Sequence, residues 1–212
     1  MAARLQERMV TIARGDDPAQ TLEGVYLAGG AESRRGAVLA APHPEYGGSM
    51  ESPVLSELAW ACCQSEITSL RFNWRGVGAS TGSVSGAAGD ADVDYAAALD
   101  HLAETVDGPV VACGYSFGAA SAVRAAAGRA RVEQLILVAP PPALVPPDAI
   151  ADLERATLIV VGAQDTLASP QVLSQALLDA PGVTVEVLPH ADHFFGQGLA
   201  ALGRLAQEWL AA

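Results

Sequence analysis

The stretch "VVACGYSFGAAS", residues 110–121, joins an apolar run to an alanine-rich run through a very short turn. The first run is typical of a buried strand and the second of a helix. Between them, Ser116 lies in a G-x-S-x-G pentapeptide that is bounded by Gly114 and Gly118. We expect a strained backbone at Ser116 that holds its hydroxyl clear of the sheet. The two glycines are expected because neighbouring backbone would come too close for a side chain.

Strand-like and helix-like runs alternate along the rest of the chain. The predicted strands are 9–13, 22–28, 36–41, 67–74, 109–114, 134–139, 157–162 and 183–188. The predicted helices are 52–65, 90–106, 117–127, 170–180 and 198–211. From the third onward, the strand-like runs are rich in Val, Ile and Leu, as strands buried on both faces are. The pattern predicts an α/β fold, a three-layer α/β/α sandwich on a mostly parallel eight-stranded sheet, with an antiparallel N-terminal edge. We expect one domain over 1–212.

Composition narrows the classes of partner. Half of the 212 residues are apolar and 17% are charged, which is typical of a globular protein. A net charge of −12 disfavours nucleic acid and anionic membrane surfaces as partners. No apolar run approaches the roughly 18 residues of a membrane helix, and "MAARLQERMV" lacks the apolar region of a signal peptide. We therefore expect a cytoplasmic protein.

The three cysteines, Cys62, Cys63 and Cys113, form neither an even disulfide framework nor a zinc-binding spacing. We interpret them as buried, reduced thiols. The sequence predicts no metal and no organic cofactor.

A serine hydroxyl becomes a nucleophile only beside a base, and the base needs an acid that orients it. Ligands of parallel sheets bind at the carboxyl ends of the strands, so the residues that follow each strand are the candidates for a site. Asp165 follows the strand 157–162, and two histidines follow the strand 183–188. The order serine, acid, histidine is typical of hydrolases. We predict Ser116 as nucleophile and Asp165 as the acid.

Of the two histidines, His193 is the predicted base. It lies farther into the loop than His190 and directly precedes Phe194 and Phe195, which could form a pocket wall. His190 is interpreted as structural. Asp192 is a competing acid, but adjacent side chains point apart, so Asp165 is preferred.

Acyl transfer also needs hydrogen-bond donors for the developing oxyanion. The N–H of Phe117, which follows the nucleophile, is one expected donor. The second is expected from the loop 41–50, "APHPEYGGSM". Pro44 has no N–H, which leaves Glu45 or Tyr46, and Glu45 is preferred.

Other polar residues near these strand ends are interpreted as structural. His43 is expected to brace its loop by bonding to backbone. Arg75, in the glycine-rich block "FNWRGVGASTG" (72–82), is expected to be structural, with contact to a substrate anion as the alternative. The carboxylates of the helix around 90–104 are expected to form a solvated face; they are Asp90, Asp92, Asp94, Asp100 and Glu104.

The blocks "PHPEYGGSM", "FNWRGVGASTG", "GYSFG", "GAQDT" and "ADHFF" resemble the α/β-hydrolase superfamily over nearly the whole chain. They are most similar to small bacterial serine hydrolases related in architecture to dienelactone hydrolases. The resemblance implies Ser116 as nucleophile, Asp165 as acid, His193 as base, and Phe117 with Glu45 or Tyr46 as oxyanion donors.

The sequence departs from that group at three places. Dienelactone hydrolases use a cysteine nucleophile, which argues against dienelactone as the substrate. The connection at about 140–156 is short and rich in proline, where many relatives insert a helical lid. The acid is followed by "TLASP" rather than by a nearby Val-Pro.

We expect a substrate pocket that includes Tyr115, Leu144 and Phe194. A thin lid predicts a shallow site for short or flexible acyl groups, although a second copy of the chain, in a homodimer, could supply the missing wall. The predicted activity is hydrolysis of a small-molecule ester or thioester through an acyl-enzyme on Ser116. The alternatives are a peptidase or amidase with the same triad, and a noncatalytic interaction protein that keeps the fold.

Overall fold

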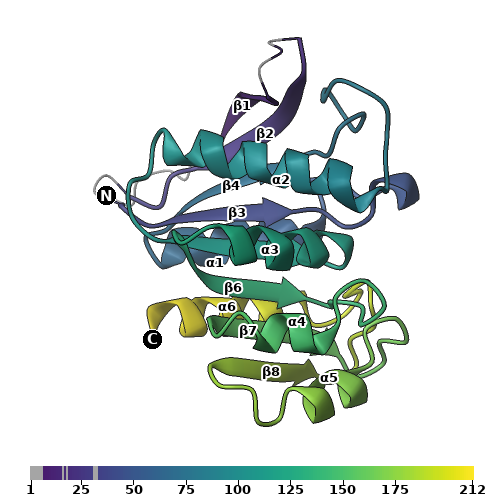
Figure 1. Ribbon diagram of the computed structural model, residues 1–212. Coiled ribbons are helices and arrows are strands. Elements are labelled where there is room, and N and C mark those ends of the chain that lie inside the picture. The colour runs from purple at the N-terminus through teal and green to yellow at the C-terminus, as the bar shows by residue number, and fades with distance from the viewer. Residues whose placement is uncertain (1–6, 16, 18, 31–32) are drawn as a thin grey trace.

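The computed structural model describes residues 7–15, 17, 19–30 and 33–212. Its centre is an eight-stranded sheet with the order β1-β2-β4-β3-β5-β6-β7-β8 (Figure 1). The strands are β1 (Glu7–Ala13), β2 (Thr21–Leu27), β3 (Gly36–Ala40), β4 (Thr68–Phe72), β5 (Val110–Tyr115), β6 (Val132–Val138), β7 (Ala156–Gly162) and β8 (Val183–Leu188). β2 is antiparallel to both of its neighbours, and all the other pairs are parallel. The predicted antiparallel edge is therefore confirmed.

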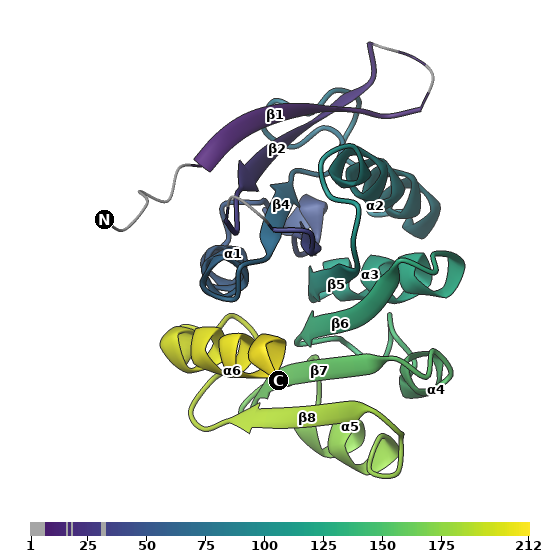
Figure 2. The same cartoon turned by 90° about the vertical axis from the view of Figure 1, so that its left-hand side faces the viewer.

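Helices cover both faces of this sheet and make three layers. Figure 2 shows α1 (Pro53–Gln64) and α6 (Leu199–Ala211) on one face. The opposite face carries α2 (Ala88–Ala103), α3 (Phe117–Gly128), α4 (Pro147–Ala151) and α5 (Pro170–Ala176). Two helices begin at a start signal in the sequence, because α1 and α5 each have a serine followed by proline in the first turn. No helix among the described residues is long and apolar enough to cross a membrane.

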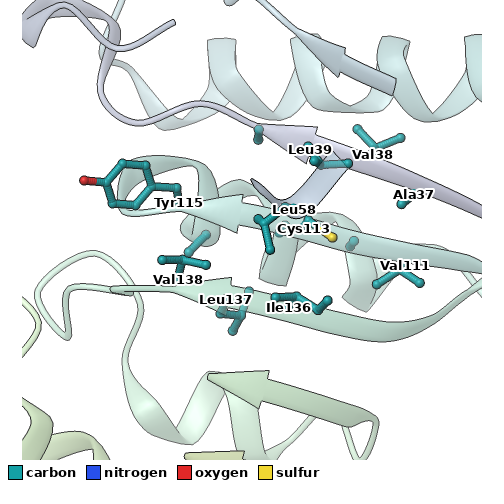
Figure 3. Close-up of a cluster of buried hydrophobic side chains, with 14 of the residues drawn as sticks. Ala37, Val38, Leu39, Leu58, Val111, Cys113, Tyr115, Ile136, Leu137 and Val138 are labelled. Atoms are coloured by element: carbon teal, nitrogen blue, oxygen red, sulfur yellow. The ribbon is translucent and has the colours of Figure 1, made fainter. Parts of the chain in front are cut away.

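The core fills the space between these layers because the central strands are apolar on both faces. All residues of β3 and β5 are buried. Figure 3 shows Leu39, Val111 and Ile136 of neighbouring strands packed together, with Leu58 of α1 beside them. Each fully buried side chain of this kind contributes about 1.5–3 kcal/mol. The three cysteines are free and buried, as predicted.

The predicted helix 170–180 is shorter in the structure. α5 ends at Ala176 rather than at 180, and Leu177–Ala180 forms turns instead. The short connection 140–156 holds one helix, α4, which is what its length allows.

The expectation of a solvated acidic face on α2 is wrong for Asp94, whose side chain is only 1% exposed. Asp94 lies on the side of α2 that faces the sheet, beside Tyr95 and Ala91 in the buried set. Its carboxylate accepts hydrogen bonds from the backbone N–H of Arg75 (2.9 Å) and from the Arg75 guanidinium (2.8 Å). Arg75 also pairs with Asp90, which confirms its structural interpretation.

Candidate active site

Ser116 lies at the corner between β5 and α3 in a strained conformation. Its φ is 54° and its ψ is −111°, a region that residues with a side chain rarely occupy. A Cβ on Gly114 would lie 2.2 Å from the carbonyl oxygen of Gly118, and a Cβ on Gly118 would lie 2.4 Å from that of Ala40. Both glycines are therefore required by close backbone packing, as predicted.

The structure brings Ser116, His193 and Asp165 together from three separate strand ends. The His193 Nε2 lies 3.0 Å from the Ser116 Oγ, and the His193 Nδ1 lies 2.8 Å from the Asp165 Oδ2. All three residues are buried, with exposed fractions of 9%, 7% and 5% respectively. Because a carboxylate only accepts, Nδ1 carries the ring proton and Nε2 can accept the proton of the serine hydroxyl. This arrangement can turn Ser116 into a nucleophile.

Asp165 is fixed by the loop that follows β7. Its Oδ1 accepts hydrogen bonds from the N–H groups of Leu167 (2.8 Å) and Ala168 (2.7 Å). The other carboxylate oxygen is then directed at His193. The segment "TLASP" supplies both N–H donors, so it positions the acid although it departs from the usual pattern.

Tyr115 holds the main chain of the His193 loop. Its hydroxyl donates a hydrogen bond of 2.7 Å to the carbonyl oxygen of His193. Figure 3 shows the Tyr115 ring at the end of β5, with its hydroxyl directed away from the core cluster. Burial raises the pKa of Tyr115 well above its usual range, and the negative charges of Asp165 and Asp192 add to this. The hydroxyl therefore stays protonated and remains a donor.

The two neighbours that the sequence offered as alternatives have other positions. Asp192 accepts hydrogen bonds from the N–H groups of Phe194 (3.1 Å) and Gly196 (3.3 Å), so its carboxylate stabilises the turn. His190 is exposed and has a positive φ of 64° at the end of β8. Neither of them is hydrogen-bonded to the His193 ring among the described residues.

The loop after β3 lies beside Ser116, but its predicted oxyanion donors already have acceptors. The N–H of Glu45 donates to the His43 ring (3.3 Å), and the N–H of Tyr46 donates to the His43 carbonyl oxygen (3.1 Å). His43 thus bonds to backbone, as its structural interpretation predicted. Within the described residues, the N–H groups of Phe117 and His43 have no hydrogen-bond acceptor. The His43 and Phe117 rings also pack together, with centroids 4.6 Å apart.

A cavity of about 780 Å³ opens onto Ser116 and His193. Two predicted pocket residues, Tyr115 and Phe194, line it. Leu144 does not: it is 45% exposed on the connection after β6. The wall has a residue that the sequence prediction missed, Leu167, which lies two positions after the acid. The other lining residues are Pro42, His43, Tyr46, Gly47, Gly48, Ser49, Glu51, Ser52 and Pro53.

The sequence also matches a known protein family. The sequence model of the family described as "Serine aminopeptidase, S33" matches residues 33–156, more than half of the chain. A curated, uncharacterized protein of Rickettsia prowazekii (strain Madrid E) is 31% identical over 126 residues. That alignment covers 58% of this chain and 52% of the relative, so it spans only about half of the relative's length.

Solved structures are similar over nearly the whole chain. An α/β serine hydrolase homologue from Coxiella burnetii is 28% identical with a TM-score of 0.81, and 96% of each chain is covered. A serine hydrolase without lid from Xanthomonas campestris is 26% identical with a TM-score of 0.80, covering 97% of this chain and 94% of that one. A dienelactone hydrolase from Anabaena variabilis shares the fold at 22% identity and a TM-score of 0.78, covering 98% of this chain and 97% of its own.

Proposed function

Because the chain belongs to the serine aminopeptidase S33 family of α/β hydrolases, we propose that it cleaves a carboxylic ester or thioester through an acyl-enzyme on Ser116. The observation that carries this proposal is the hydrogen-bonded series Ser116–His193–Asp165, with separations of 3.0 and 2.8 Å. A protein that only binds partners has no need of a strained serine beside an oriented imidazole.

In the proposed reaction His193 takes the proton of Ser116 as the serine oxygen attacks the acyl carbon. The imidazolium that forms faces the Asp165 carboxylate, which stabilises it. His193 then gives the proton to the leaving alcohol or thiol, and the acyl group stays on Ser116. Water, activated by the same imidazole, hydrolyses the acyl-enzyme and restores the serine.

The oxyanion would be held by two backbone N–H groups. Phe117 is one, because its N–H lies at the start of α3 next to the nucleophile. For the second, Glu45 and Tyr46 would have to give up their present acceptors. The N–H of His43 needs no such exchange, so we propose His43 as the second donor. One donor of this kind is worth about 3–4 kcal/mol in the transition state.

Among the described residues no lid covers Ser116, because the connection between β6 and β7 carries only the five-residue α4. We propose small or flexible acyl groups for this reason. The three free cysteines support a reducing compartment, and we include a cytoplasmic location in the proposal.

Covalent labelling tests the proposal. Wild type and Ser116→Ala would each be incubated with a fluorophosphonate, and the intact proteins weighed. A single adduct on wild type that is absent from Ser116→Ala is the expected result. If folded wild type takes up no adduct, the noncatalytic alternative replaces the proposed one. A panel of p-nitrophenyl esters and aminoacyl anilides then separates an esterase from a peptidase.

A further inference from the structure

We infer that the proposed substrate carries a positively charged, ammonium-type group, and that Glu51 determines this preference. The inference deepens the proposed function, on which it rests. It comes from the chemistry of the cavity wall around Ser116.

The first observation is the charge of the cavity. Among its described lining residues, Glu51 alone carries a full formal charge at pH 7; the only other titratable side chains there are His43, His193, Tyr46 and Tyr115. No arginine is among the described residues that line the cavity, and the chain of 212 residues contains no lysine. A bound anion would therefore meet a carboxylate and no side-chain cation.

Among the described residues, six arginines are held in ion pairs with carboxylates outside the cavity lining. Arg75 is paired with the carboxylates of α2, and Arg124 is paired with Asp92 at 2.8 Å. Other pairs join Arg14 to Asp94, Arg34 to Asp107, Arg71 to Glu7, and Arg129 to Asp100. The formal charge of the cavity lining is therefore negative, and so is the net charge of the chain, which is −12.

The second observation is the aromatic rim. Tyr46 and Phe194 line the cavity and are 86% and 74% exposed. Large aromatic side chains are usually buried because exposing them to water is costly. An aromatic face attracts a cation that lies within about 6 Å of the ring centre, and aromatic side chains are used to recognise quaternary ammonium groups. Two exposed rings and a carboxylate around one cavity are the groups that together bind such a cation.

Glu51 itself is free to take part. It is exposed, and the described residues give its carboxylate no ion pair or hydrogen bond. Only its backbone is fixed, because its N–H donates to the Ser49 hydroxyl at 3.3 Å. It lies just before α1, far in sequence from the His193 loop, and both segments line the same cavity.

The experiment uses three p-nitrophenyl esters of similar acyl length that differ in charge. They are the butyrate (neutral), the 4-(trimethylammonio)butyrate (cationic) and the hemiglutarate (anionic). We expect kcat/KM to fall in the order cationic, neutral, anionic, with at least about fivefold between the two charged esters, the effect of one carboxylate in a wet site. The preference should shrink as salt is raised from about 0.01 to 1 M, since the Debye length falls from about 30 to 3 Å.

Butyrylthiocholine moves the ammonium group to the leaving side and is compared with a neutral thioester of similar size. A cation preference for only one of the two ammonium substrates identifies the side of the scissile bond that faces Glu51. A preference for neither overturns the inference.

Substitutions at Glu51 test its role, and a substitution at Glu133 removes an equal charge elsewhere as a control. Glu51→Gln should bring the cationic-to-anionic ratio of kcat/KM close to that of the uncatalysed reaction, and Glu51→Arg should reverse it. Glu133→Gln is the matched control, because Glu133 is exposed near the amino end of β6, away from the carboxyl ends that carry the site. It should keep the wild-type ratio. Equal ratios in wild type, Glu51→Gln and Glu133→Gln would overturn the inference.

Failure of the inference and failure of the proposed function give different results. If the function is wrong, no ester is cleaved in a Ser116-dependent way and fluorophosphonate does not label the protein. If only the inference is wrong, labelling and Ser116-dependent cleavage persist, but kcat/KM for the hemiglutarate equals that for the cationic ester.

Discussion

Replacing Tyr115 with phenylalanine removes the hydroxyl group that is hydrogen-bonded to the main chain of the predicted base, His193. The Tyr115 hydroxyl is buried and donates to the carbonyl oxygen of His193 at 2.7 Å. Phenylalanine fits the same space, so the change leaves no cavity but deprives that carbonyl of its donor. Losing such a buried hydrogen bond costs about 1–2 kcal/mol of unfolding free energy. For a chain of this size, that lowers Tm by about 2–8 °C.

The same variant should also change the response to alkaline pH. The pKa of Tyr115 is raised by burial and then by Asp165 and Asp192, whereas an unfolded tyrosine ionises near pH 10. Above about pH 10 the unfolded state therefore binds fewer protons than the folded state. The stability contribution is fully present below pH 10 and is lost as pH rises, by about 1.4 kcal/mol per pH unit. Tyr115→Phe lacks this loss, so its deficit relative to wild type should narrow at about pH 11.

The third consequence concerns reactivity. With its carbonyl released, the His193 loop should hold the imidazole less precisely, and the rate of fluorophosphonate labelling should fall about tenfold at a temperature where the variant is folded. Urea unfolding at pH 7 and 11 and labelling kinetics measure the three effects. Tyr26→Phe is the control: Tyr26 is also buried, but its hydroxyl has no hydrogen-bond partner among the described residues. If Tyr115→Phe were as stable and as reactive as Tyr26→Phe, Tyr115 would not position His193.

Two other substitutions test the corner and the acid. Asp165→Asn should keep the fold but favour the wrong tautomer of the imidazole, slowing acylation by about 10⁴-fold in a stopped-flow or labelling assay; a loss below tenfold would contradict the predicted acid. Gly118→Ala places a Cβ 2.4 Å from the carbonyl oxygen of Ala40 and should destabilise the protein by about 3 kcal/mol or more in urea unfolding. Gly128→Ala, near the end of the same helix with nothing within 4 Å of its Cβ, should be neutral or stabilising by up to about 1 kcal/mol. Equal stability of the two glycine variants would show that the corner tolerates a side chain.

The positions of the eight strands and of the three predicted triad residues could be predicted because each has a strong local signal. A strand buried on both faces is rich in apolar residues, as β5 is, and this local pattern does not depend on distant residues. In a parallel sheet, the residues that follow the strands gather at one edge. Knowing only that Asp165 and His193 follow two such strands was therefore enough to expect them near Ser116.

The features that the sequence did not predict depend on contacts between distant segments. In the sequence, Asp94 cannot be distinguished from the other carboxylates of its helix. Only its position on the inner side of α2 brings it into contact with Arg75, 19 residues away in sequence. Leu144 is an apolar residue in a loop, and nothing local tells whether that loop turns toward the cavity. A signal for Leu167 did exist: a residue two positions after the acid must lie close to it, because its N–H bonds the carboxylate.

Two residues at the start of the glycine-rich block 72–82, Asn73 and Trp74, support the loop after β3. The Asn73 side chain accepts a hydrogen bond from the N–H of Met50 (2.8 Å), at the far end of that loop. The Trp74 indole donates to the carbonyl oxygen of Ala41 (3.1 Å), at its beginning, and to that of Pro42 (3.2 Å).

The same indole packs edge-on against Phe117, with ring centroids 5.6 Å apart. One side chain therefore contacts both segments from which oxyanion donors are proposed. Trp74→Phe keeps an aromatic ring at this position but removes the donor and leaves a small cavity, because Trp74 is only 1% exposed. It should lower kcat for the best ester more than it raises KM, while fluorophosphonate labelling still requires Ser116. If kcat were unchanged, the loop would hold its shape without Trp74, and the block would serve the fold alone.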